Sequence, residues 1–248
     1  MCSSISRLLS WYSCGAASAV ATKLMLAEGP CEIVYCDTGA EHEDNARFLA
    51  DCEAWFKQPI VRIKSDKYAD TWSVWEKTRW LAGIEGARCT DELKKQPRFA
   101  YQKPHDKHVF GYTCDSADIA RFERFKANFP ELSVRAPLIE RGISKAGAIG
   151  FLQSAGIKPP VMYALGFQNN NCIPCVKATS PDYWSLVRLR FPAKFKRMAL
   201  LSRELDVRLT RLNGERAFID QIPADWPVTD PIAPACDFLC QIALEDAQ

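Results

Sequence analysis

Two cysteines separated by two residues, Cys172 and Cys175, have a spacing that is typical of metal chemistry. A C-x-x-C turn holds two thiolates on one side of a tight loop, where one metal ion or one cluster can bind both. A four-coordinate site needs further ligands, and Cys89 lies upstream in the segment Arg88-Cys89-Thr90. Thiolates also bind Zn²⁺, so the residues alone leave open whether such a site holds iron or zinc.

A second group of residues, Ser13-Cys14-Gly15-Ala16-Ala17-Ser18, suits the binding of an anion. Small residues let backbone N–H groups approach an oxyanion, and the two Ser hydroxyls can donate hydrogen bonds to it. The N-terminus of the helix predicted to follow adds about half a positive charge. The alternative is an ordinary tight turn between a strand and a helix. The segment is neither a Walker A loop nor a G-x-G-x-x-G loop.

The triplet Asp37-Thr38-Gly39 follows a second apolar segment that is predicted to be a strand. In an open α/β sheet, ligands bind outside the carboxyl ends of the strands, at the point where the strand order reverses. We therefore expect Asp37 and Thr38 to lie beside the first turn. The alternative is a capped turn without a ligand, and it is the combination with the first turn that favours a binding site.

Apolar segments alternate with helical patterns along most of the chain, which predicts a parallel sheet with right-handed crossovers. The fold class predicted is α/β, with a Rossmann-like open parallel sheet flanked by helices. Residues 1–180 are predicted to form a nucleotide-binding domain, and 181–248 a helical, Pro-rich C-terminal region. Strands are expected at 8–12, 32–35, 60–63, 109–112 and 132–139. Helices are expected at 16–27, 44–56, 117–128, 144–155, with Ser144 as the N-cap, and 183–205, the last interrupted at Pro192. The chain after Gly214 contains four prolines and is expected to be weakly structured.

Composition gives no argument for a nucleic-acid or membrane surface, because the 248 residues carry a formal net charge of only +2. The first residues lack the apolar core of a signal peptide, and no apolar run is long enough to span a bilayer. We therefore expect a cytoplasmic protein. Its 11 cysteines are then expected to be ligands, reactive thiols or small core residues. Cys31, Cys36 and Cys52 lie in apolar segments and are predicted to be core residues.

The order of these motifs resembles the PP-loop superfamily and, within it, a phage and bacterial branch of the phosphoadenylyl-sulfate (PAPS) reductase family. Segments 37–45, 111–115, 169–177 and 183–184 also resemble that branch. The resemblance implies a PP-loop/HUP-type fold that binds an adenine nucleotide, whether PAPS, APS or ATP. The nucleotide-binding residues that it implies in the two turns are Ser13, Cys14, Gly15, Ala16, Ser18, Asp37, Thr38 and Gly39. ATP-cleaving members carry Asp where this chain has Ala17, which favours the reductase branch.

The resemblance also implies a cofactor, because cluster-containing adenylyl-sulfate reductases hold a [4Fe-4S] cluster on a Cys-Cys pair and a C-x-x-C motif. Arg88 takes the first place of the pair, so the implied ligands are Cys89, Cys172 and Cys175. Cys240 is a candidate for the fourth. The family's nucleophile stands in a C-terminal Glu-Cys-Gly motif, which Ala235-Cys236-Asp237 matches only at the cysteine. We take Cys236 as the candidate nucleophile; the alternative is that the tail cysteines are ordinary thiols.

Cations are needed to bind an anionic nucleotide, and Lys95, Arg121 and Lys145 are the candidates we favour. The alternative for each is a solvated helix face. Asp115, in one of the family-like segments, is a further candidate. Trp72 and Trp75 have helical spacing and are predicted to be core or interface residues.

Three functions remain open. The first is a PAPS/APS-reductase-like oxidoreductase that releases sulfite with a thioredoxin-like reductant. The second is an ATP-dependent sulfurtransferase or adenylyltransferase that modifies a nucleic acid or a small molecule; only this alternative has a nucleic-acid partner. The third is a non-enzymatic nucleotide or cluster sensor. We expect no membrane partner and a homo-oligomer.

Overall fold

The computed structural model describes residues 6–83 and 86–229. The chain forms two compact units whose segments alternate along the sequence. The first, which we name the sheet unit, contains the described residues 6–37, then Glu43–Ile63 and Arg98–Pro160. The second, which we name the cysteine unit, contains Thr38–His42, the described residues between Lys64 and Pro97, and residues 161–229.

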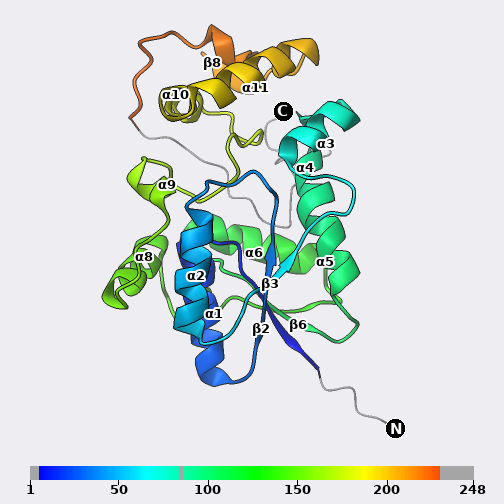
Figure 1. The fold of residues 1–248 in the computed structure, drawn as a ribbon, viewed down its shortest axis with the longest axis vertical. Helices are drawn as coiled ribbons and strands as arrows, with labels where there is room; N and C mark the ends of the chain where they lie inside the picture. The colour runs from blue at the N-terminus through cyan, green and yellow to red at the C-terminus, as the bar shows by residue number, and fades with distance from the viewer. Residues whose placement is uncertain (1–5, 84–85, 230–248) are drawn as a thin grey trace. The chain divides into compact units, whose positions relative to one another are not determined.

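The sheet unit contains one parallel sheet of five strands in the order β3-β2-β1-β6-β7. Strands β2, β3 and β6 of this sheet are labelled in Figure 1. Each strand pairs with its neighbours in parallel, for example Ser10 with both Ile33 and Val109. The central strand is buried along most of its length, as expected for a strand covered on both faces. The predicted α/β fold class is confirmed. The strands are β1 (Leu8–Trp11), β2 (Glu32–Cys36), β3 (Val61–Ile63), β6 (Lys107–Val109) and β7 (Ser133–Arg135).

Helices cover both faces of this sheet. Helix α1 packs against α2, α7 and α8, whereas α5 contacts α6 through the Arg98 guanidinium and the Phe125 ring. The β1–α1–β2 and β6–α6–β7 crossovers run in opposite directions along the sheet, so right-handed connections place α1 and α6 on opposite faces. The helices are α1 (Ala16–Glu28), α2 (Asn45–Phe56), α5 (Gln96–Tyr101), α6 (Ser116–Asn128), α7 (Pro137–Glu140) and α8 (Lys145–Ser154).

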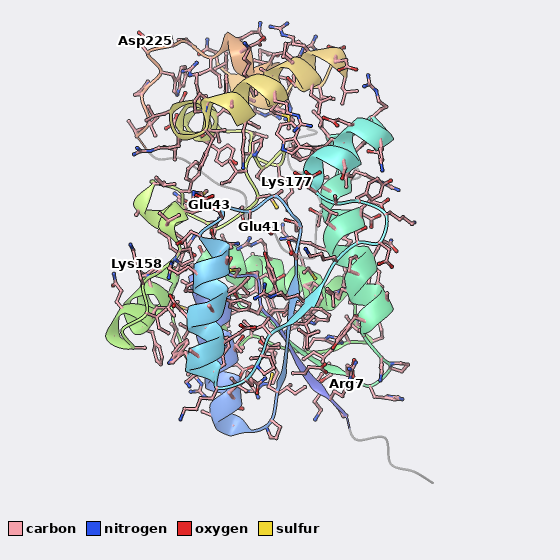
Figure 2. All side chains as sticks on the ribbon, viewed as in Figure 1. Arg7, Glu41, Glu43, Lys158, Lys177 and Asp225 are labelled. Carbon is pink, nitrogen blue, oxygen red and sulfur yellow. The ribbon has the colours of Figure 1, made fainter. Side chains whose placement is uncertain are left out.

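The strand order reverses between β1 and β6, which are neighbours at the centre of the sheet. The turn after β1 and the loop after β6 therefore leave the same carboxyl edge on either side of the switch point, where open α/β sheets bind ligands. At the amino edge of the sheet, by contrast, ion pairs join segments that are distant in the sequence. There Arg7 forms ion pairs with Asp106 at 2.7 Å and Glu32 at 3.1 Å (Figure 2).

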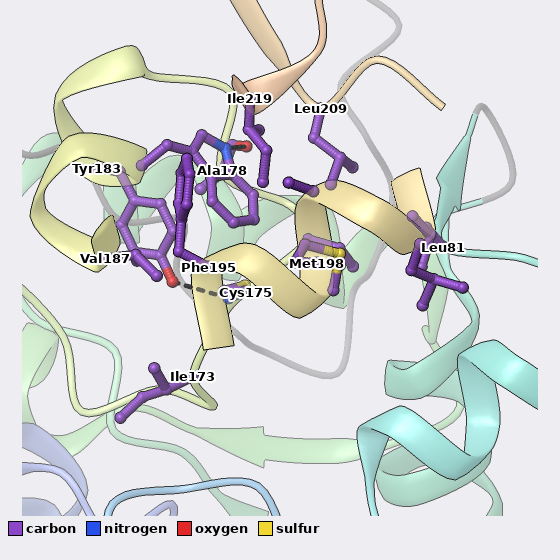
Figure 3. Packing of buried hydrophobic residues seen from close by; sticks show 14 of the residues in the cluster. Leu81, Ile173, Cys175, Ala178, Tyr183, Val187, Phe195, Met198, Leu209 and Ile219 are labelled. Carbon is purple, nitrogen blue, oxygen red and sulfur yellow. Dashed lines mark hydrogen bonds between the residues drawn. The ribbon is translucent and has the colours of Figure 1, made fainter. Parts of the chain in front are cut away.

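The cysteine unit is mostly helical and has its own apolar core. Trp75 and Trp184 are fully buried in it. Met198 and Ile219 pack into the same cluster (Figure 3). Its helices are α3 (Thr71–Thr78), α4 (Arg88–Thr90), a π-helix (Asp91–Lys95), α9 (Val161–Ala164), α10 (Pro181–Arg190), α11 (Pro192–Glu204) and a 3-10 turn (Ile219–Gln221). Its hairpins pair β4 (Ala82–Gly83) with β5 (Gly86–Ala87) and β8 (Thr210–Leu212) with β9 (Glu215–Ala217).

Several local predictions are confirmed. Cys31, Cys36 and Cys52 are buried, and Trp72 and Trp75 lie in the core. Ser144 caps α8 by accepting a hydrogen bond from the Gly147 backbone at 3.1 Å. The predicted interruption at Pro192 separates α10 from α11. Across the residues that the structure describes, every helix is too short or too polar to cross a membrane.

Three element predictions were wrong. The strand expected at 109–112 lies at Lys107–Val109, because the chain leaves the sheet at Phe110 to bring Gly111 against α1. The strand expected to continue to 139 ends at Arg135, where Pro137 starts a helix instead. The chain after Gly214, expected to be weakly structured, forms β9 and the 3-10 turn before residue 222.

A buried histidine makes the stability of the sheet unit depend on pH. His108 Nδ1 accepts a hydrogen bond from Trp11 Nε1 at 3.0 Å. Burial, followed by the nearby Arg98 charge, lowers the pKa of His108 to about 4. The unfolded chain binds a proton below pH 6.5 whereas the folded chain does not, so folded-state stability is lost as the pH falls from 6.5 towards 4.

We predict that the free energy of unfolding decreases by at most about 3 kcal/mol between pH 7 and pH 4 because of this residue. His108→Asn keeps an acceptor near the indole but does not titrate, so its unfolding free energy should change less over that range. Urea unfolding at several pH values measures the difference. Identical pH profiles for the two proteins would contradict the prediction.

Candidate functional site

The turn after β1 is built around the Ser18 hydroxyl. Ser18 Oγ accepts hydrogen bonds from the backbone N–H groups of Ser13 at 3.1 Å and Gly15 at 3.3 Å, and it donates to the Gly15 carbonyl at 3.0 Å. Ser18 is buried whereas Ser13 is exposed, and the Ser13 hydroxyl lies 3.1 Å from Ser18 Oγ. The first turn of α1 thus directs its positive end and the exposed Ser13 hydroxyl to the carboxyl edge of the sheet.

Cys14 adopts a left-handed backbone conformation, with φ of 58°. This conformation costs a non-glycine residue about 1–2 kcal/mol. The side chain is fully buried, and its Sγ lies 3.8 Å from both Tyr12 Oη and the Asn45 carbonyl oxygen. The thiol therefore points into the core, and only the backbone of Cys14 belongs to the turn.

The loop after β6 approaches the first turn of α1 closely. A Cβ atom added to Gly111 would lie 2.7 Å from the Ser18 Cα and N atoms. That distance is much shorter than any normal contact, so a side chain at this position would displace backbone. Gly111 therefore brings the two loops that flank the switch point into direct contact.

Two of the predicted cations, Arg121 and Lys145, lie near each other beyond this loop. Burial and the neighbouring Arg121 charge lower the pKa of Lys145, while Asp115 opposes the shift. Arg121 pairs with Asp118. Its Nε atom is buried and has no acceptor among the described residues. The charges of Arg121 and Lys145 therefore interact, and the Arg121 Nε–H is a donor that an anion could use.

Asp115 is exposed, and its carboxylate ties the loop to α8. Its carboxylate accepts hydrogen bonds from the Lys145 backbone N–H at 2.9 Å and the Thr113 hydroxyl at 2.7 Å. These two hydrogen bonds lower the pKa of Asp115. The arrangement gives Asp115 the role of orienting the start of α8, which carries Lys145.

Asp37 directly follows β2, and its backbone N–H donates to the Ile63 carbonyl at 2.9 Å. Thr38 and Gly39 belong to the cysteine unit. Gly39 has φ of 63°, and an added Cβ would lie 2.3 Å from the Ala69 carbonyl oxygen. This glycine is therefore required by backbone packing, whatever the triplet binds.

The first cysteine of the C-x-x-C loop lies among polar groups of the cysteine unit. Cys172 Sγ is 3.0 Å from Thr38 Oγ1 and 3.8 Å from Glu41 Oε1. The loop is anchored to the same segment, because the Ile173 backbone N–H donates to the Ala40 carbonyl at 3.0 Å. Burial lowers the pKa of Lys194, and the nearby Cys172 opposes that shift.

The second cysteine, Cys175, is buried in the apolar core. Its backbone N–H donates to the Tyr183 hydroxyl oxygen at 2.7 Å (Figure 3). Burial raises the pKa of Tyr183 well above its usual range, with Cys175 next in importance. Cys89 is half-buried and packs against the same apolar cluster as Cys175.

These cysteines do not form a completed metal site. Thiolates are suitable donors for iron–sulfur clusters and zinc. Within residues 6–83 and 86–229, however, no three His, Cys, Asp or Glu side chains are grouped as metal ligands. Cys236 and Cys240 lie outside the described residues. The ligand set Cys89, Cys172, Cys175 and Cys240 therefore stays a prediction, as does Cys236 as nucleophile.

Some features of the site have no clear sequence signal. Lys95 belongs to the cysteine unit, whereas Arg121 and Lys145 belong to the sheet unit, so its part in binding the nucleotide stays a prediction. Arg98, in a helical pattern that favours a solvated face, is fully buried under the rings of Phe99 and Phe129. Burial lowers the pKa of Arg98 to about 10. Lys194 and Glu41 approach Cys172 only through the tertiary fold, so periodicity alone does not identify them.

The strand order and the turn at the start of α1 together define an open, parallel α/β fold of the Rossmann-like class. Among solved structures, the chain is similar to phosphoadenylyl-sulfate (PAPS) reductase from Candida auris in a phosphate complex, with a TM-score of 0.52 and 12% sequence identity. The similarity covers 68% of this chain and 82% of that chain, and it shows the fold that the motifs predicted. No family model and no curated protein matches the chain.

We predict that Gly111→Ala destabilises the sheet unit by about 1–3 kcal/mol, because the new methyl group must displace the first turn of α1. Gly150→Ala is the matched control. Nothing lies within 4 Å of a Cβ added to Gly150, so in α8 this change should stabilise the protein by about 1 kcal/mol. Urea unfolding measures both. Equal stability of the Gly111 variant and the parent would show that the contact is not tight.

Proposed function

We propose that the chain is a PAPS/APS-reductase-like enzyme that binds an adenylyl sulfate at the carboxyl edge of the sheet unit. The observation that carries the proposal is the convergence at one edge of the Ser18-centred turn, the Gly111 contact and the pair Arg121 and Lys145. The turn offers the N-terminus of α1 to an oxyanion, with the exposed Ser13 hydroxyl, which donates to Ser18 Oγ, beside it. The two cations supply opposite charge, and the buried Nε of Arg121 offers a donor that no described residue uses.

The reaction we propose starts with attack of a cysteine thiolate, with Cys236 as the candidate, on the sulfate sulfur. A sulfur–sulfur bond forms while the bond between that sulfur and the phosphate-bridging oxygen breaks, and the nucleotide phosphate leaves with the electron pair. A dithiol of the thioredoxin class then attacks the enzyme cysteine sulfur. Sulfite leaves, and after thiol–disulfide exchange the reductant is left as a disulfide and the enzyme cysteine as a thiol.

The cations have a defined role in this reaction. Negative charge grows on the bridging oxygen as its bond to sulfur breaks, and fixed positive charge beside that oxygen stabilises the transition state. Lys145 is well suited to this role because it is partly withdrawn from water and Asp115 holds its helix in place. No step of the proposal passes through a cluster, because the described cysteines are not grouped as its ligands.

A second candidate function is sulfur transfer, which one observation favours. Cys172 places a half-buried thiol beside the Thr38 hydroxyl, with Lys194 nearby. A thiol in such a polar setting suits a carrier of sulfur. In that case ATP would activate an acceptor, which Ala17 disfavours because ATP-cleaving relatives carry an acid there.

We predict that Lys145→Gln weakens binding of adenosine 3′-phosphate 5′-phosphosulfate about ten-fold, the effect of losing about 1.4 kcal/mol of charge interaction. Calorimetric titration measures the affinity. Lys158→Gln removes an exposed lysine of the same unit and should leave it unchanged.

Sulfite release with thioredoxin as reductant tests the chemistry, and Cys236→Ser should abolish it. Nucleotide binding without sulfite release, together with pyrophosphate release from ATP in the presence of an acceptor, would replace the first function by the second. No nucleotide binding at all would contradict both.

A further inference from the structure

The cysteine unit contains a pocket of ≈ 460 Å³ that the proposed reaction does not use. It lies at the end of α3, between the β4–β5 hairpin and the π-helix. Its lining includes Trp80, Arg88, Asp91 and Lys95. A volume of this size falls within the range of small-ligand sites.

The indole of Trp80 contacts the backbone of the β4–β5 hairpin, although the residue is exposed. Its Nε1 donates to the Gly86 carbonyl at 3.3 Å. A Cβ atom added to Gly83 would lie 2.7 Å from Cζ2 of the indole. Gly83 and Gly86 are paired across the hairpin, so the absence of both side chains lets the ring lie against the backbone. The residue nevertheless remains 42% exposed.

Of the two cations that line the pocket, Arg88 forms ion pairs within the described chain and Lys95 does not. Arg88 pairs with the buried Glu92 at 2.6 Å and lies 4.0 Å from Asp91. Lys95, in contrast, forms no ion pair with any residue of the described chain. The pocket therefore offers an ammonium group, an aromatic surface and a carboxylate within one set of lining residues.

We propose that this pocket binds a nucleotide, with its base stacked on Trp80 and its phosphate at Lys95. Aromatic stacking accepts any base, and a lysine binds phosphate as a point charge. Asp91 can accept a hydrogen bond from an amino group or a ribose hydroxyl. The residues that line the pocket all belong to the cysteine unit, and none of them is among the residues of the sheet unit proposed above to bind adenylyl sulfate. The nucleotide in the pocket is either free or part of a single-stranded nucleic acid.

The test uses two probes on the full-length protein: adenosine 5′-monophosphate, followed by calorimetry, and a fluorescein-labelled twelve-residue oligothymidylate, followed by anisotropy. Both are measured in the Lys145→Gln background, which weakens the site in the sheet unit. Trp80→Ala should weaken binding about ten-fold, and Trp80→Phe should restore most of it because stacking persists. Lys95→Gln should lower the salt dependence of oligonucleotide binding by about 0.7 in the log–log slope.

Two matched controls separate the pocket from general surface effects. Phe99→Ala removes a ring that is also 42% exposed but does not line the pocket. Lys94→Gln removes the lysine next to Lys95, which also does not line it. Both variants should bind as the parent does.

Each outcome decides the proposal. Monophosphate binding that Trp80→Ala weakens supports a free nucleotide as ligand, and binding of the oligonucleotide alone, again weakened by Trp80→Ala, supports a single-stranded nucleic acid. Failure of both probes to bind, or equal binding by the Trp80→Ala and Phe99→Ala variants, would overturn it. If Trp80→Ala does not fold, Trp80→Phe and Lys95→Gln decide the result. Absence of sulfite release would contradict the reductase proposal and leave this one unaffected.

Discussion

The contact between Gly111 and the first turn of α1 is the constraint on which the candidate site depends. The strand order places β1 and β6 side by side, but adjacency alone leaves their loops free to diverge. The absence of a Cβ at Gly111 lets the two backbones meet, so that the turn bonded to Ser18 and the segment from Thr113 to Asp115 form one surface. The position of Lys145 follows from it, because Asp115 accepts a hydrogen bond from the first residue of α8.

Much of the sheet unit follows from local sequence pattern. Buried parallel strands are short apolar runs, and β1, β2 and β3 lie where such runs were found. The cap at Ser144 and the break at Pro192 rest on side-chain chemistry that acts within one turn of helix. The end of β6 was misplaced because Phe110 and Tyr112 suit a strand, whereas a backbone contact with α1 diverts the chain there. Such a contact leaves no trace in periodicity.

Part of the candidate site was also predictable, because that part is formed by residues close together in the sequence. The turn from Ser13 to Ser18 is a local motif, and its hydrogen bonds join residues at most five positions apart. The surroundings of Cys172 come from residues more than one hundred positions earlier in the chain, Thr38 and Glu41, and from Lys194. Trp80 and Lys95 line one pocket because the chain that connects them folds into a two-glycine hairpin and then into the π-helix that ends at Lys95. In the sequence, each residue around Cys172 and each residue of the pocket resembles an ordinary surface or core residue, so the sequence pattern does not identify it.

The alternation of the two units along the chain has a consequence for how the protein can be divided. The chain passes from one unit to the other after residues 37, 42, 63, 97 and 160. No single cut releases either unit as a continuous polypeptide, so neither unit can be produced alone as one uninterrupted segment of the chain. One passage separates Asp37 from Thr38, the two halves of a single motif. Thr38, whose hydroxyl lies 3.0 Å from Cys172 Sγ, is therefore joined by a single peptide bond to Asp37, the residue that follows β2.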